Sequence, residues 1–110
     1  MIDIHMHTIY SDGDKTVEEV LKMCEDKKLE YISITDHDTC KQYDDEALKC
    51  NKIFSGKIIK GSELHAVFQN KNIEILAYNI NPNVINPCLS HISNNLCLHI
   101  FCCSLNLSSE

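Results

Sequence analysis

The sequence predicts an α/β fold in which short parallel strands alternate with helices. Residues 2–7 alternate between apolar and polar side chains, the period of two that is typical of a strand. Residues 17–28 carry apolar side chains at helical spacing. Two further short strands are predicted, one over residues 31–35 and one that begins at residues 58–59. This β-α-β-α-β order favours a parallel sheet or barrel with its helices outside. The 110 residues, 44% of them apolar, are enough for one modest domain.

The first strand carries an apolar and a polar set of side chains on opposite faces: Ile2, Ile4, Met6 and Asp3, His5, His7. A loop follows at Ser11-Asp12-Gly13. Thr16 and Glu19 then form the T-x-x-E pattern of a capping box, which satisfies the first free amides of a helix. We therefore expect the first helix to begin at about residue 17 and to end at about residue 28.

The second strand and helix repeat this arrangement. Residues 31–35 form a short run with Ile32 and Ile34 on one face, which predicts a strand. Thr39 to Gln42 is another capping-box pattern. The apolar stripe after it predicts one helix over residues 43–54.

The third strand is expected to begin at Ile58 and to lead through Gly61 to Glu63. Residues 73–78 are predicted as a fourth strand. It would pair as a hairpin with residues 64–68, across a turn at residues 70–72.

Charge and cysteine content limit the classes of function. The net charge is −6 and every positive charge is a lysine, so stable binding to a nucleic-acid backbone is not expected. The seven cysteines include no C-x-x-C pair, and their odd number does not suit a disulfide framework. Most of them are predicted to be buried small hydrophobes. Because the N-terminus shows no charged-then-apolar leader, we expect a cytoplasmic protein.

The composition changes in the C-terminal part. No lysine or arginine follows Lys71, and after Glu74 the next acidic residue is Glu110. The apolar stretch LCLHIFCCSLNL at residues 96–107 is too short to span a bilayer. It predicts a buried helix or strand, a membrane-surface segment, or sequence unrelated to the domain. We expect residues 82–110 to form an atypical tail and do not expect a membrane partner.

Imidazole and carboxylate groups gather where the predicted strands end. His5 and His7 share one strand face, as two ligands of one metal ion would. In a parallel α/β barrel, catalytic groups lie at the C-terminal ends of the strands. The next strand ends and the first loop supply further groups there: Asp12, Asp36, His37 and Glu63. Mixed imidazole and carboxylate ligands suit zinc, manganese or iron better than magnesium.

Four stretches of the chain resemble the N-terminal half of the PHP (polymerase and histidinol phosphatase) family. They read DIHMHTIYSDG, TVEEVLKMCEDKKLEYISITDHDT, GSE and IEILAYNIN. The resemblance covers residues 1–81, which would form a partial PHP domain. It implies the N-terminal part of a distorted (β/α)7 barrel, whose strand ends hold up to three metal ions and which hydrolyses phosphoesters.

The resemblance also implies a set of metal ligands. His5 and His7 would bind a first metal ion, and Glu63 would bridge it to a second. Asp12 and His37 would serve a third ion.

Other polar residues of these motifs would act indirectly or not at all. Asp36 would orient the histidine that follows it through a hydrogen bond, and Asp3 would also support the ligands from outside the metal's own shell. Asp38 and Thr39 complete the T-D-H-D-T motif, and capping of the next helix explains them. His65 is expected to be a rim or core histidine.

The implied reaction is hydrolysis of a phosphomonoester, or of the end of a nucleotide or oligonucleotide, by a metal-activated water. A sugar phosphate or histidinol phosphate is an alternative substrate of the same class. The family's later ligands do not appear, because LSHISN around His91 and CLHIFC around His99 do not match its motifs. Glu74 also stands where the family usually has a histidine. The alternative interpretations are a truncated, inactive metal-binding fragment or interaction module, and a homo-oligomer that completes the site across chains.

Overall fold

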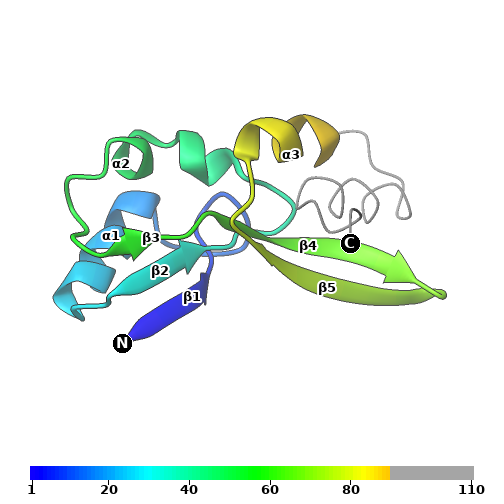
Figure 1. The fold of residues 1–110 in the computed structure, drawn as a ribbon, viewed down its shortest axis with the longest axis horizontal. Coiled ribbons are helices and arrows are strands. Elements are labelled where there is room, and N and C mark those ends of the chain that lie inside the picture. The colour runs from blue at the N-terminus through cyan, green and yellow to red at the C-terminus, as the bar shows by residue number, and fades with distance from the viewer. Residues whose placement is uncertain (90–110) are drawn as a thin grey trace.

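The structure is a computed structural model in which residues 1–89 are described. Three strands form a parallel sheet in the order β1 (Ile2–Met6), β2 (Tyr31–Ile34), β3 (Lys57–Ile58). Between them lie three helical segments: α1 (Val17–Asp26), the 3-10 helix η1 (Lys41–Asp44) and α2 (Glu46–Lys49). An antiparallel hairpin and a last helix follow: β4 (Gly61–Phe68), β5 (Lys71–Tyr78) and α3 (Pro82–Leu89). The hairpin extends away from the sheet, which gives the molecule an elongated shape (Figure 1).

The first strand–helix–strand unit folds as predicted. Thr16 Oγ1 accepts a hydrogen bond from Glu19 N at 3.2 Å, and the Glu19 carboxylate accepts one from Thr16 N at 3.4 Å, which completes the capping box. The helix ends two residues earlier than predicted, close to Lys28, whose φ of 56° is left-handed and cannot continue it. One stripe of α1 is buried in the core that it shares with Ile32 of β2: Val17, Val20, Leu21 and Cys24.

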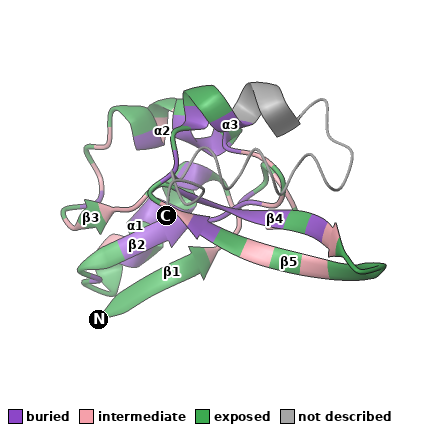
Figure 2. Cartoon of the chain, turned by 45° about the vertical axis from the view of Figure 1, so that its right-hand side comes forward, coloured by how far each residue is buried: buried purple, intermediate pink, exposed green. Residues whose placement is uncertain are grey.

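Strand β1 lies at the edge of the sheet and is exposed along most of its length (Figure 2). Its pairing with β2 is irregular between Asp3 and Met6, as at a β-bulge. Ile2 is 58% exposed and Ile4 is 37% exposed. The hairpin reaches this strand through Tyr78, whose Oη donates a hydrogen bond to Ile4 O at 2.7 Å. The edge strand is therefore anchored by a side chain.

The predicted single helix over residues 43–54 is wrong, because η1 and the short α2 take its place. Asp45 separates the two with an extended backbone (φ −63°, ψ 133°), and its side chain accepts a hydrogen bond from Ala47 N at 2.9 Å. Aspartate side chains compete in this way with a continuous helix. The predicted cap at Thr39 is also wrong, since its Oγ1 accepts from Lys41 N and η1 has no side-chain cap.

The third strand is shorter than predicted and the hairpin is longer. Strand β3 ends at Ile58, and Glu63 lies inside β4 instead of ending the third strand. The hairpin turn consists of Gln69 and Asn70, with φ values of 50° and 62°, and not of residues 70–72. Two consecutive positive φ angles are typical of the tight turn whose twist matches that of the flanking strands.

Tyr43 joins the hairpin to the parallel sheet. Its Oη donates a hydrogen bond to Ile34 O at 2.7 Å and accepts one from Gly61 N at 2.7 Å. Burial raises the pKa of Tyr43 to about 12, so the hydroxyl stays protonated. Gly61 leaves no room for a side chain, because a Cβ there would lie 2.6 Å from Ser33 Oγ.

Helix α3 lies where the atypical tail was expected to begin. Ile85 of this helix is 2% exposed and belongs to the hydrophobic core. The division at residue 81 stays a prediction, and the apolar stretch at residues 96–107 lies outside the described residues. Within residues 1–89, no helix has the length and apolar character needed to cross a membrane.

Tyr43→Phe should destabilise the fold by about 1–3 kcal/mol, because it leaves the buried Gly61 N–H without its acceptor. The free energy of unfolding in urea measures this loss. Tyr31→Phe is the matched control, since Tyr31 is 38% exposed, and it should stay within about 0.5 kcal/mol of the parent. Equal stability of the two variants would show that the Tyr43 hydroxyl does not hold the junction.

Candidate metal centre

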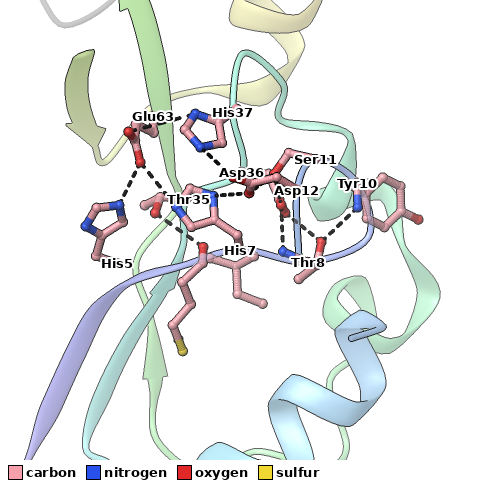
Figure 3. A network of polar contacts seen from close by, with 12 residues as sticks. His5, His7, Thr8, Tyr10, Ser11, Asp12, Thr35, Asp36, His37 and Glu63 are labelled. Atoms are coloured by element: carbon pink, nitrogen blue, oxygen red, sulfur yellow. Dashed lines mark hydrogen bonds and ion pairs between the residues drawn. The ribbon is translucent and has the colours of Figure 1, made fainter. Parts of the chain in front are cut away.

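Five predicted site residues meet at the C-terminal ends of β1 and β2, beside the start of the hairpin (Figure 3). His5 lies on β1, and His7 follows the last residue of that strand. Asp12 lies in the loop after β1, and His37 follows β2. Glu63 of β4 reaches the same place because its main chain forms an isolated parallel bridge with His37.

Glu63 is the centre of this cluster and is almost fully buried. Its Oε1 lies 2.6 Å from His5 Nε2 and 3.2 Å from His7 Nε2. Its Oε2 lies 3.8 Å from His37 Nδ1. Because the two oxygens face different imidazoles, Glu63 can serve two neighbouring metal ions at once.

Asp12 faces the opposite nitrogens of two of these rings. Its Oδ1 lies 3.4 Å from His7 Nδ1, and its Oδ2 lies 3.2 Å from His37 Nε2. The rings of His7 and His37 stack, with centroids 4.5 Å apart and planes inclined by 22°. The Asp12 side chain is 66% exposed, so the centre is open to solvent on this side.

Glu74 of β5 joins the cluster, although the sequence did not predict it as a site residue. One ligand atom each from His37, Glu63 and Glu74 lies within 4.8 Å of the others. In the hairpin register Glu74 pairs with His65, which is two residues from Glu63, so the two acids share one face. The strand register was the signal that could have found Glu74.

Glu63 and Glu74 shift each other's pKa in opposite directions. Burial acts to raise the pKa of Glu63, but hydrogen bonds with Glu74 and His5 and the charge of His37 outweigh it and hold the pKa below its ordinary value. The hydrogen bond with Glu63, and then its negative charge, raise the pKa of Glu74. Two acids placed in this way can bind a divalent cation together.

Comparison with known proteins identifies the family. A family model described as the PHP domain matches residues 3–98, which is most of the chain. The chain belongs to the PHP family. It is similar to the solved structure of a proposed metal-dependent phosphoesterase from Bifidobacterium adolescentis, with 28% identity and a TM-score of 0.71. Its fold is also similar to that of an amidohydrolase from Chromobacterium violaceum, solved with bound sulfate and no metal, with 24% identity and a TM-score of 0.65.

The PHP chain spans about one third of the length of these structural relatives. The similarity covers 81% of this chain, but 32% of the Bifidobacterium chain and 30% of the Chromobacterium chain. A search of curated proteins finds no match. The predicted PHP family and the partial PHP-type α/β fold are thereby confirmed.

The residues of this PHP chain fit divalent metal ions. His7 Nδ1 is buried and makes no hydrogen bond, although Asp12 Oδ1 lies 3.4 Å away, and two ring nitrogens converge on the same oxygen of Glu63. A neutral imidazole offers one unprotonated nitrogen. Since His7 and His37 each belong to two of the three groups, the described residues could hold two ions at once, each with three ligand atoms. The overlapping groups are His5-His7-Glu63, His7-Asp12-His37 and His37-Glu63-Glu74.

Asp36 is fully buried, and its hydrogen-bond partners differ from the predicted one. Its Oδ1 accepts from Thr8 N at 2.7 Å and from Ser11 Oγ at 2.5 Å, and its Oδ2 accepts from Thr8 Oγ1 at 2.7 Å. The expected orientation of His37 by Asp36 is therefore corrected: Asp36 binds the loop that follows β1.

The other polar residues of the motifs lie outside the three ligand groups. Asp3 Oδ1 accepts a hydrogen bond from His5 N at 3.2 Å, so its contact with the site is made through the main chain. Asp38 Oδ1 accepts from His65 N at 2.8 Å and does not cap a helix. The His65 side chain is exposed on β4 near Glu74. Two histidines lie outside the described residues: His91 and His99.

Glu63→Gln should release most of the bound metal, because each oxygen of Glu63 faces a different ligand group. Glu74→Gln should release one ion only, since Glu74 belongs to one group. Metal content per chain, measured by mass spectrometry after loading with zinc or manganese, distinguishes the two results. Glu18→Gln on the surface of α1 is the control and should keep the full load. Equal losses in the Glu63 and Glu74 variants would contradict the bridging role.

Proposed function

We propose that this PHP chain is part of a metal-dependent phosphoesterase that hydrolyses phosphomonoesters, or the ends of nucleotides and oligonucleotides, with a metal-activated water. The observation that supports the proposal is the sharing of Glu63 between two ligand groups at one end of the strands. Neighbouring ions bridged by a carboxylate suit phosphoryl transfer, because they can stabilise both the attacking and the leaving oxygen.

The protein residues would hold the metal ions and leave the centre accessible. Divalent ions, when bound, lower the pKa of a coordinated water and neutralise charge on the phosphoryl oxygens. His5 and His7 supply nitrogen ligands on the side of β1, and Glu63 supplies oxygen from the hairpin. His5 is 50% exposed and Asp12 is 66% exposed, so a substrate can approach from their side. Since the net charge is −6, an anionic substrate depends on the ions for attraction.

The chemistry of the ligands guides the remaining assignments. Imidazole and carboxylate together favour zinc, manganese or iron. A small phosphorylated compound or nucleotide is the proposed partner, in a cytoplasmic protein without a membrane or stable nucleic-acid partner. Association of copies into a homo-oligomer is proposed as the way in which further ligands could be supplied.

An inactive metal-binding fragment or interaction module is the second candidate. It is favoured by the number of ligands, because the three groups of the described residues overlap and could hold two ions at once, whereas the resemblance to the family implies up to three. The number of ions held and the turnover of a phosphoester distinguish the two candidates.

The first test is metal content together with hydrolysis of p-nitrophenyl phosphate and of nucleoside monophosphates. His7→Ala should lower the metal content and the rate of hydrolysis. The loss of activity should exceed the roughly 10–100-fold that follows when an outer-shell partner of a metal ligand is removed. His99→Ala is the control and should keep the metal. Bound metal without turnover of any phosphomonoester would favour the inactive module. Metal release by His99→Ala equal to that of His7→Ala would contradict the placement of the site.

A further inference from the structure

A buried carboxylate holds the loop that carries Asp12. The side chains of Asp36 and Thr8 are both 0% exposed. A buried charge is costly unless it is hydrogen-bonded, and the loop satisfies Asp36 with the Thr8 amide, the Thr8 hydroxyl and the Ser11 hydroxyl (Figure 3). The loop is therefore attached to the end of β2 at two of its residues.

The main chain of the loop closes between these attachments. Ser11 N and Gly13 N both donate to Thr8 O, at 3.1 and 2.9 Å. Gly13 also packs so closely on the preceding strand that a Cβ would lie 2.6 Å from His7 O. Asp12 thus lies between Ser11 and Gly13, whose positions are fixed by these contacts.

The carboxylate of Asp12 has little support of its own. It is 66% exposed, and its hydrogen bond from Ser11 Oγ is long, at 3.5 Å. Its ion pairs are with His7 and His37, the same rings that belong to the ligand groups. Its position opposite these rings therefore depends on the main chain of the loop, which the short bond from Ser11 to Asp36 holds.

We propose that Ser11 is a positioning residue of the metal centre, which holds the Asp12 carboxylate against His7 and His37 through its hydrogen bond to Asp36. This inference rests on the proposed metal-dependent function. Asp12 can bind an ion, or it can accept the ring N–H groups of the two histidines while their other nitrogens bind ions. Both roles need the carboxylate in the same place, so Ser11 supports either.

Ser11→Ala tests this role, and it should fold because Asp36 keeps both hydrogen bonds from Thr8. Its affinity for Zn²⁺, measured by competition with a chromophoric chelator, should fall about 10-fold or more. Asp12→Ala should lose at least as much. The double variant should bind no more weakly than Asp12→Ala alone, since Ser11 acts only through Asp12. Ser11→Thr keeps the hydroxyl and should restore the affinity.

Ser55→Ala is the matched control, because Ser55 Oγ also donates to a carboxylate, that of Glu25 at 3.0 Å, outside the ligand groups. It should leave the Zn²⁺ affinity unchanged. Parent-like affinity of Ser11→Ala, or a loss that adds fully to that of Asp12→Ala, would overturn the proposal.

Hydrogen exchange separates this inference from the proposed function. Without metal, the amides of residues 8–13 should exchange faster in Ser11→Ala than in Ser55→Ala, because the loop loses one attachment. If the parent chain bound no Zn²⁺, the proposed function would fail, and this comparison would still decide on Ser11. Equal exchange in the two variants would refute the role of Ser11.

Discussion

Hydrogen bonds between residues 36–38 and 62–63 hold the hairpin against the parallel sheet, and the candidate metal centre depends on this junction. Glu63 N donates to Asp36 O at 3.1 Å, and Asp38 N donates to Glu63 O at 3.0 Å. Ser62 Oγ adds a bond to Asp36 O at 2.9 Å. Because of this contact, an antiparallel element supplies a carboxylate to imidazoles at the ends of parallel strands. The spacing of nitrogen and oxygen ligands is thus set by main-chain geometry, which is more rigid than side-chain contacts alone.

The first strand–helix–strand unit and most of the cluster could be predicted because their causes are local. Alternation along one strand is enough to bring His5 and His7 together. Glu74 was missed because its place depends on the pairing register of two strands, which residue types alone specify weakly. The break at Asp45 was missed because the apolar stripe continues through it. The Asp45 side chain accepts a hydrogen bond from Ala47 N and so competes with a continuous helix there.

Asp36 shows where a sequence motif identifies a residue but not its contacts. Asp36 and His37 are adjacent in the T-D-H-D motif, which suggests that one orients the other. In extended chain, however, successive side chains point in opposite directions. Asp36 accordingly turns into the interior towards Thr8, while His37 turns towards the ligand groups. Ser11, which the sequence marked only as part of a loop, also donates a hydrogen bond to this buried carboxylate.

The exposed position of β1 links metal binding to folding. The strand that carries His5 has one neighbouring strand in the described part of the chain, and Tyr78 of the hairpin contacts it through a single hydrogen bond. An ion held jointly by His5 and Glu63 would cross-link this edge strand to the hairpin. Its binding free energy would then contribute to the cohesion of the whole N-terminal unit. Chelation would loosen the scaffold as well as empty the site, so metal supply during synthesis would influence how much folded protein accumulates.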